Sequence, residues 1–417
     1  MQTKNKRVLI IGGGPAGMAA ALYALRAGAD TILLEKNEKT GKKLYITGKG
    51  RCNLCNACDL NTLIDSVPRN PRFLYAAFRF LPPNKLMEDI EGLGCPTKVE
   101  RGQRVYPISE KASDVTRALL HGIENAEVML NTEVDSLMLE DGTVRGVILK
   151  DGRRIAADAI VVATGGLSYP MTGSTGDGYR FAREAGHAVE TCFPSLVPIN
   201  LQGEWWKPLQ GLSLKNVLLS MWSNGKKQFA KQGEMLFTHF GISGPLVLSM
   251  SAHLVETDNV RIEIDLKPAL TEEILDNRLM RDLAAESRKL LTTVMTGYLP
   301  SAMAPIFPSL AGIEPDKVAG QVTAKERRKL ARLFKHLPLG FAGLRSFSEA
   351  VITRGGINVK EIDPSTMASK KINGLFFAGE VLDVDGYTGG FNLQIAFSTG
   401  SLAGASAAQY ITKEKEV

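Results

Sequence analysis

Cysteine and histidine are scarce in this sequence: there are five of each in 417 residues, and the first histidine is His121. Cys52, Cys55 and Cys58 follow one another at C-x2-C-x2-C spacing, but the next cysteine is Cys95. An iron–sulfur run needs a fourth cysteine close by, and a structural zinc site needs a second pair or histidines at ligand spacing. We therefore predict no bound metal. The odd, clustered set also argues against a disulfide framework.

Long apolar runs are also missing, since none reaches the ~18 residues that cross a bilayer. The first apolar run, residues 8–11, follows basic residues but stops in a glycine loop, which is too short for a secretory signal peptide. We interpret it as a buried strand and expect a cytoplasmic protein with neither a membrane nor a DNA partner. The length allows two or three cores, and the net charge of +6 permits an anionic partner without requiring one.

Residues 7–36, RVLIIGGGPAGMAAALYALRAGADTILLEK, have the pattern of a dinucleotide-binding unit. An apolar β-branched run, a glycine turn, an Ala- and Leu-rich helix and a second strand ending at Glu35 follow in that order. Gly12 permits the tight turn, Gly14 lets the backbone approach a pyrophosphate at the helix N-terminus, and Gly17 allows close helix–strand packing. Glu35 is placed to accept hydrogen bonds from a ribose.

A second motif lies near the other end of the chain, in residues 371–411. A short strand is followed by Glu380, a glycine loop that contains Asp385, and a long helix of small residues that begins near Asn392. This order is typical of the second FAD contact of glutathione-reductase-like flavoproteins, in which the helix N-terminus faces the flavin ring.

A third motif occupies residues 158–186, where the strand-like AIVVATGG is followed by Thr175 and Asp177 just before another helix. Three such motifs in this order predict FAD rather than NAD alone, on a glutathione-reductase-like Rossmann fold of the α/β class. No second complete G-x-G-x-x-G unit is visible, so any NAD(P)H would visit the flavin transiently. No His or Cys lies in a recognisable flavinylation motif, so we expect non-covalent FAD.

The stretch KKLYITGKGRCN is predicted to run along the flavin edge. Gly48 and Gly50 allow close backbone approach. Arg51 can neutralise a pyrophosphate or the reduced flavin, and Asn53 can hydrogen-bond the ring or the substrate. Cys52 is the one cysteine that a motif places, and Arg51 should favour its thiolate. We interpret the next two cysteines as small apolar fillers or partly exposed thiols.

Four stretches carry a resemblance to a known family: RCN after TGKG, ATGGLSYPMTGSTGDGY, MLFTHFGISGP and FFAGEVLDVDGYTGGFNLQIAFSTG. In this order, over nearly the whole chain, the sequence resembles the BaiN/RdsA-type family of FAD-dependent oxidoreductases, also known as aminoacetone-oxidase-like flavoproteins. Cys55 stands where members usually have threonine, which favours a tolerated small residue over a metal ligand. The resemblance implies activities that include uridine reduction to dihydrouridine in large-subunit ribosomal RNA, a steroid-like double-bond reduction and aminoacetone oxidation.

Two sets of site residues follow from these motifs and the resemblance. The catalytic residues are predicted to be Cys52, His239 and Arg51, with Cys52 and His239 as the alternative proton donors. The residues predicted to contact FAD are Gly12, Gly14, Pro15, Ala16, Gly17, Glu35, Lys36, Gly50, Arg51, Cys52, Asn53, Val134, Thr164, Gly165, Gly166, Thr175, Asp177, Gly379, Glu380, Asp385, Gly390, Asn392 and Leu393.

From about Phe193 the pattern changes to short alternating strands with turn signals such as Asn224-Gly225, and helix-like segments follow. His239 lies in this part, in LFTHFGISGP, and two alternatives stay open for it: an inert histidine at a strand end, or a polar group that faces the flavin. The predicted organisation is an FAD-binding domain of residues 1–192 and 346–417, a β-rich insertion of residues 193–270 and a helical insertion of residues 271–345.

Basic charge concentrates in the insertion, because residues 193–345 carry 19 Lys and Arg against 14 Asp and Glu, a net charge of +5. The segment KERRKLARLFKHL has one apolar helical face, made of Leu330, Leu333, Phe334 and Leu337. Six of its other positions are basic: Lys325, Arg327, Arg328, Lys329, Arg332 and Lys335. This pattern is that of a solvated amphipathic helix or of a surface that contacts RNA phosphates.

Three functions remain open from the sequence. The first is an FAD-dependent oxidoreductase that reduces an activated carbon–carbon double bond, in a small molecule or in ribosomal RNA. The second is an oxidase of small amines that produces peroxide. The third is a non-catalytic, flavin-bearing protein that binds RNA.

Overall fold

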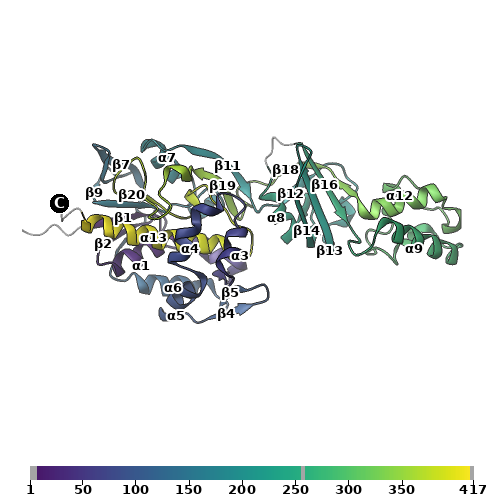
Figure 1. Ribbon diagram of the computed structural model, residues 1–417, viewed down its shortest axis with the longest axis horizontal. Coiled ribbons are helices and arrows are strands. Elements are labelled where there is room, and N and C mark those ends of the chain that lie inside the picture. The colour runs from purple at the N-terminus through teal and green to yellow at the C-terminus, as the bar shows by residue number, and fades with distance from the viewer. Residues whose placement is uncertain (1–6, 255–258, 414–417) are drawn as a thin grey trace, which may run out of the picture. The chain divides into compact units, whose positions relative to one another are not determined.

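The computed structural model describes residues 7–254 and 259–413 (Figure 1). The chain forms two compact units: Met1–Ser195 with Phe347–Val417, and Leu196–Ser346. Strand β11 (Val189–Ser195) pairs with β19 (Ile352–Ile357) in antiparallel register within the first unit. Phe193, the predicted start of the insertion, therefore lies in a strand of the first unit, and the second unit begins only after Ser195.

A five-stranded sheet forms the centre of the first unit, and its strand pairs are all parallel. Four of its strands are apolar runs that are almost wholly buried, as crossover connections on both faces require, and only the edge strand β6 is partly exposed. The first crossover is α1 (Pro15–Arg26), and α13 (Phe391–Lys413) also packs on this sheet (Figure 1). The spatial order is β20 (Leu375–Phe377), β10 (Ala159–Val162), β1 (Arg7–Ile11), β2 (Asp30–Leu34) and β6 (Glu127–Met129).

Helices α1 and α13 lie unusually close because small residues meet at their contact. A Cβ atom on Gly400 would lie 2.2 Å from the carbonyl oxygen of Ala16, and one on Gly404 would lie 2.0 Å from that of Ala20. Only glycine fits at either position. The small-residue composition of α13 is thus explained by packing, which holds the middle of this helix against the first turns of α1.

Smaller elements complete the first unit. Two three-stranded antiparallel sheets contain β7 (Val134–Glu140), β8 (Thr143–Leu149) and β9 (Arg154–Ala156), and β3 (Cys55–Asn56), β5 (Arg104–Pro107) and β4 (Thr97–Glu100). The remaining helices are α2 (Lys42–Ile46), α3 (Leu60–Asp65), α4 (Tyr75–Phe80), α5 (Pro83–Gly92), α6 (Ala112–Gly122) and α7 (Asp177–Glu184).

The second unit is built on a seven-stranded antiparallel sheet. Asn224 and Gly225 both have positive φ, so the predicted turn between β13 and β14 is of type I′, which suits the twist of a hairpin. The spatial order is β17 (Leu337–Leu339), β16 (Val260–Asp265), β13 (Ser213–Ser223), β14 (Lys226–Phe237), β15 (Gly241–Ser243), β12 (Ile199–Leu201) and β18 (Phe341–Leu344).

The helices of the second unit require two corrections to the sequence-based prediction. Residues 245–251, expected in strands, form α8 (Pro245–Ser251), because Pro245 takes the first helical position after Gly244 at φ +97°. Leu337, expected on a helical face, lies in β17, where buried and exposed residues alternate. The other helices are α9 (Glu272–Ala285), α10 (Leu291–Met295), α11 (Phe307–Leu310) and α12 (Ala324–Lys335).

Candidate functional site

The glycine turn after β1 is closed on one side and open on the other. A Cβ on Gly12 would lie 2.6 Å from the carbonyl oxygen of Ala163, and one on Gly17 would lie 1.8 Å from that of Gly12. At Gly14, the residue before α1, no described atom other than those of its chain neighbours lies within 4 Å of that position. The open side therefore faces the N-terminus of a 12-residue helix, where a pyrophosphate binds well.

Glu35 is held rigidly at the end of β2. Its carboxylate accepts hydrogen bonds from the backbone N–H of Gly13 at 2.8 Å, and from the backbone and side-chain N–H groups of Asn37 at 2.8 and 2.6 Å. The residue is 8% exposed. The acid that the sequence assigned to a ribose is thus fixed beside the glycine turn.

Three of the predicted FAD contacts meet in one cluster. Lys36 Nζ donates to Thr175 Oγ1 at 2.6 Å and to Asp177 Oδ2 at 2.6 Å, across about 140 residues of sequence. Asn37 Nδ2 also donates to the carbonyl oxygen of Thr172. The loop before α7 is therefore folded over the end of β2.

Glu380 joins four segments of the first unit. Its carboxylate accepts from Lys43 Nζ at 2.7 Å, from the backbone N–H and the hydroxyl of Thr353 at 2.9 Å each, and from the hydroxyl of Ser168. Burial alone would raise the pKa of Glu380, but the Lys43 ammonium and these donors hold it below its usual range. Sequence reasoning missed Lys43, Ser168 and Thr353, because no local pattern reveals partners so distant in sequence.

Two aspartates on the loop before α13 lie in opposite environments. Asp383 accepts from Arg69 Nε at 2.6 Å and from the amide of Asn70. Asp385 is 1% exposed and its Oδ2 accepts from the Ser195 hydroxyl at 3.0 Å, while its Oδ1 has no hydrogen-bond partner among the residues that the structure describes. Burial, the largest cause, raises the pKa of Asp385 to about 6. One carboxylate is thus a satisfied ion pair, and the other is an incompletely satisfied acid.

The residues present fit FAD. The hydroxyl of Thr164, on the loop after β10, is also buried without a partner, as is Asp385 Oδ1. Orphaned buried polar atoms are rare in folded proteins and indicate a missing ligand or water. Together with the open side at Gly14, they would suit a ligand with hydroxyl groups and a pyrophosphate.

The loop TGKGRCN packs against the start of α13. With its amide oriented to satisfy both ends, Asn53 accepts from the backbone N–H of Gly390 at 2.9 Å, and Asn56 Nδ2 donates to the carbonyl oxygen of Gly389 at 3.1 Å. A Cβ on Gly390 would lie 2.3 Å from the carbonyl group of Cys55. This contact requires glycine at Gly390 and brings two predicted motifs together.

Arg51 is bound by carboxylates of its own unit. Its Nη2 donates to Glu100 at 2.6 Å and to Glu110 at 3.0 Å, and its guanidinium lies 4.2 Å from the centre of the Tyr106 ring. The Arg51 charge is therefore already balanced. The expectation that Arg51 promotes a Cys52 thiolate was wrong: burial raises the pKa of Cys52 to about 12, and the thiol is fully buried.

The other cysteines of the cluster are buried too. Cys55 is completely buried, and Cys58 and Cys95 are nearly so; burial raises the pKa of all three thiols. Within residues 7–254 and 259–413, no three His, Cys, Asp or Glu side chains converge as metal ligands would. In that same part of the chain, no helix is long and apolar enough to cross a membrane.

The remaining predicted residues lie in the first unit, except His239, which lies in the second. Val134 is buried at the start of β7, just after Thr132, whose backbone N–H donates to the carbonyl oxygen of Glu35. His239 belongs to the second unit: it is exposed in the turn between β14 and β15, with its ring 4.9 Å from that of Phe240. The others lie in the segments already described: Pro15, Ala16, Gly50, Gly165, Gly166, Gly379, Asn392 and Leu393.

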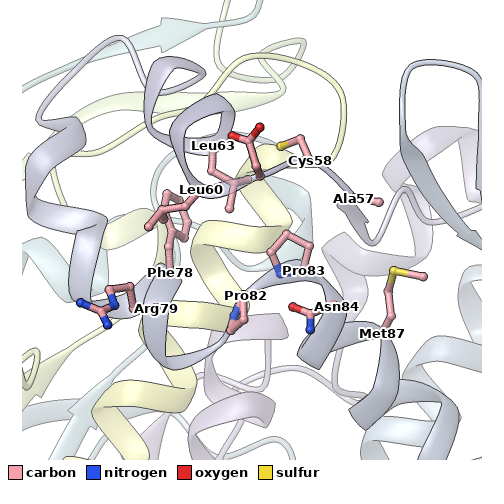
Figure 2. A pocket seen from close by; sticks show the side chains of 11 residues that line it. Ala57, Cys58, Leu60, Leu63, Phe78, Arg79, Pro82, Pro83, Asn84 and Met87 are labelled. Carbon is pink, nitrogen blue, oxygen red and sulfur yellow. The ribbon is translucent and has the colours of Figure 1, made fainter.

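A separate hollow of about 390 Å³ lies between α3, α4 and α5 (Figure 2). Figure 2 shows Leu63, Phe78 and Met87 among its lining side chains, with Arg79 and Asn84 at its edge. None of its lining residues is a predicted FAD contact. This mostly apolar groove is therefore distinct from the site at the sheet.

Solved structures show which fold this is. A flavocytochrome c3 fumarate reductase in its open conformation aligns over 98% of this chain and 79% of its own, with a TM-score of 0.53 at 18% identity. The quinol fumarate reductase of E. coli aligns over 99% of this chain and 72% of its own, with a TM-score of 0.52 at 17% identity. The predicted fold class, a glutathione-reductase-like FAD-binding Rossmann domain, is thereby confirmed.

Sequence relatives narrow the class further. A 3-dehydro-bile acid delta(4,6)-reductase of Clostridium scindens is 31% identical over 97% of this chain and 99% of its own length. A ribosomal RNA dihydrouridine synthase of Haemophilus influenzae is 29% identical over 94% of this chain and 96% of its own. A ribosomal RNA dihydrouridine synthase of E. coli is 27% identical over 94% of this chain and 95% of its own length.

Fold, site and relatives together define an oxidoreductase of the FAD-dependent class. Residues 6–406 match the HI0933-like protein Rossmann domain, and the chain belongs to this family. The resemblance seen in the sequence is therefore confirmed.

Proposed function

We propose that this protein uses non-covalent FAD to reduce an activated carbon–carbon double bond, and that uridine in large-subunit ribosomal RNA is the substrate to test first. The observation that carries the proposal is the glycine turn itself, which is open at Gly14 before the N-terminus of α1 and has the Glu35 carboxylate fixed beside it, as the pyrophosphate and ribose of FAD require. The names of the relatives support the reaction, because a delta(4,6)-reductase and a dihydrouridine synthase both saturate a ring double bond. An rRNA substrate would place the protein in the cytoplasm.

FAD, when bound, would supply a hydride to one carbon of the double bond. This chain would hold the ribose through Glu35, seat the pyrophosphate at Gly14, and provide hydrogen-bonding groups through Thr164 and Asp385. The second carbon needs a proton, and a positioned acid speeds such a step by about 10²–10⁴-fold. We favour His239 over Cys52 as donor, because His239 is exposed and the Cys52 thiol has no surface with which to touch a substrate.

The electron donor is proposed to be NAD(P)H that binds transiently, because the described structure has one G-x-G-x-x-G turn, which FAD would occupy. Loss of Glu35 should weaken FAD binding by roughly 1.5–3 kcal/mol, since charge-assisted hydrogen bonds to the ribose disappear. Titration of flavin-free Glu35→Ala protein with FAD measures this directly. A protein that takes up NAD but no FAD would end the proposal.

The substrate is tested by mass spectrometry of ribosomal RNA from cells with and without this gene. We expect one dihydrouridine to disappear in the deletion strain, to return with the native gene, and to return poorly with the His239→Gln variant. Unchanged dihydrouridine together with peroxide formation from aminoacetone would favour the amine oxidase instead. Unchanged dihydrouridine together with reduction of a small-molecule enone would keep the reaction and exclude the RNA.

A further inference from the structure

The basic residues of α12 fall into two groups, and the first is bound within the protein. Arg327 donates from Nε and Nη2 to the two carboxylate oxygens of Asp276 on α9, at 2.8 and 3.0 Å. Lys335 pairs with Asp265 on β16 at 2.6 Å and donates to two backbone carbonyl oxygens. These residues fasten α12 to its neighbours, so we leave Arg327 out of the proposed binding surface.

The second group faces solvent, and we call it the basic stripe. Its four members are exposed, and in the described part of the chain none of them forms an ion pair. Their spacing of i, i+3, i+4 and i+7 puts them on one face of the helix. Leu330, Ala331 and Phe334 are buried on the opposite face. The stripe consists of Lys325, Arg328, Lys329 and Arg332.

The apolar face of α12 is not available for insertion into a lipid surface. Phe334 packs against Tyr298 and Phe307, with ring centres 5.6 and 4.5 Å apart. An amphipathic helix binds a membrane by inserting its apolar face, and here that face is already used in the core of the second unit. The helix therefore offers charge without an insertable surface.

A protein partner is also disfavoured at the stripe. Protein interfaces depend on apolar or aromatic anchors in their centre. The exposed large apolar residues of the second unit, within the described chain, are Ile274, Met280 and Leu290, and none of them lies on α12. What remains is a row of flexible cations, which suits a regular polyanion.

We propose that the basic stripe binds the phosphate backbone of an RNA substrate. This inference rests on the proposed function and adds the surface that would hold the RNA. The stripe covers about 10 Å of helix, at 1.5 Å per residue, which is long enough for successive phosphates of one strand. Such contacts position the nucleic acid and carry no sequence information.

The test compares two double variants of the full-length flavoprotein with the same change in net charge. Arg328→Gln with Arg332→Gln removes half of the stripe. Lys215→Gln with Lys226→Gln, at exposed positions of β13 and β14 in the same unit, is the control. Binding of fluorescein-labelled oligouridine is measured by anisotropy over a series of KCl concentrations.

Removing one cation that binds a phosphate of a single strand should lower the slope of log K against log salt by about 0.7. We expect this slope to be about 1.4 smaller in the stripe variant and unchanged in the control, with flavin absorbance unchanged in both. Equal decreases in the two variants, or no decrease in the stripe variant, would overturn the proposal. So would displacement of the RNA by polyglutamate of equal charge, because this would indicate a site for any polyanion.

Failure of the stripe and failure of the proposed function give different results. Suppose that deletion of this gene removes the dihydrouridine, but that the purified stripe variant binds oligouridine with the native salt slope. These two results together contradict only the role of the stripe. A native protein without salt-dependent RNA binding contradicts both the stripe and the RNA substrate. Enone reduction by that same protein would still support the double-bond chemistry.

Discussion

The cations around the proposed cofactor site and the cations of the basic stripe are used in opposite ways. In the first unit, Lys36, Lys43, Arg51 and Arg69 each contact a carboxylate of the same unit, and these pairs tie loops together around the proposed cofactor site. In the second unit, the four cations of the basic stripe have no acidic partner within the described residues. Charge near the cofactor site is therefore used to fix geometry, whereas charge on α12 is left available for a ligand.

The largest expected effect comes from the Glu380 network. Glu380→Ala would leave the Lys43 ammonium and three other donors without their acceptor, and loss of one partner of a buried pair costs about 3–5 kcal/mol. Glu286→Ala, which removes an exposed pair with Lys289 in the second unit, should cost less than about 1 kcal/mol.

Hydrogen exchange resolved by unit is the suitable measurement for this pair of variants. All three tryptophans lie in the second unit, so tryptophan fluorescence reports on that unit and misses the first. We expect Glu380→Ala to lose protection in β1 and β10 while its tryptophan signal stays native. Similar losses for the two variants would show that the difference between the units is smaller than we argue.

Two glycines of the same turn should respond differently to alanine. Gly17→Ala places a Cβ 1.8 Å from a backbone oxygen and should destabilise the first unit by about 3 kcal/mol, because the backbone must move. Gly14→Ala meets no protein atom, so we expect native stability but FAD binding weakened about tenfold. Thermal unfolding of flavin-free protein, followed by FAD titration, separates the two effects. Unaltered FAD affinity in Gly14→Ala would exclude this turn as the pyrophosphate site.

Arg327 and Arg328 are neighbours in sequence with opposite predicted roles. Arg327→Gln should lower the stability of the second unit by about 1–3 kcal/mol, because it breaks a bidentate pair with Asp276. Arg328→Gln should leave stability within about 0.5 kcal/mol of native, as expected of an exposed position. Denaturant titration followed by tryptophan fluorescence measures both. Equal losses of stability in the two variants would mean that Arg328 also stabilises the second unit.

His187 gives the first unit a pH dependence. Its ring is buried between Glu361, 3.2 Å from Nδ1, and Ser369, 2.7 Å from Nε2, and burial lowers its pKa. Glu361 opposes this shift and Lys371 supports it. As the pH falls, His187 is therefore protonated in the unfolded chain before it is protonated in the folded chain. The free energy of unfolding should fall as the pH drops below about 6.5.

His187→Gln should remove this slope while keeping a polar side chain, and the exposed His121→Gln should keep it. Unfolding of the first unit, measured by hydrogen exchange between about pH 7 and pH 5, provides the readout. A slope that survives in His187→Gln would assign the pH dependence to another group. The effect is expected to be the smallest of this series, because it reflects a single partly opposed shift.

Elements whose cause lies within a few residues could be predicted from the sequence. The glycine turn, the strand that ends at Glu35 and the Asn224-Gly225 hairpin follow from backbone sterics and from apolar periodicity, which act over a few residues. Helix α12 was also visible, because its apolar and basic spacing is contained in one segment. The order of three such motifs was enough to predict the fold class.

Tertiary structure alone decided which charges are used and which remain available. Arg51 and Arg327 looked like ligand contacts in the sequence, and both proved to be bound by carboxylates from distant segments. Burial reversed the expected pKa shift of Cys52, and the Lys43–Glu380 pair joins residues 337 positions apart. Desolvation and ion pairing depend on which atoms the folded chain brings within a few ångströms, and no local pattern of residues encodes that distance.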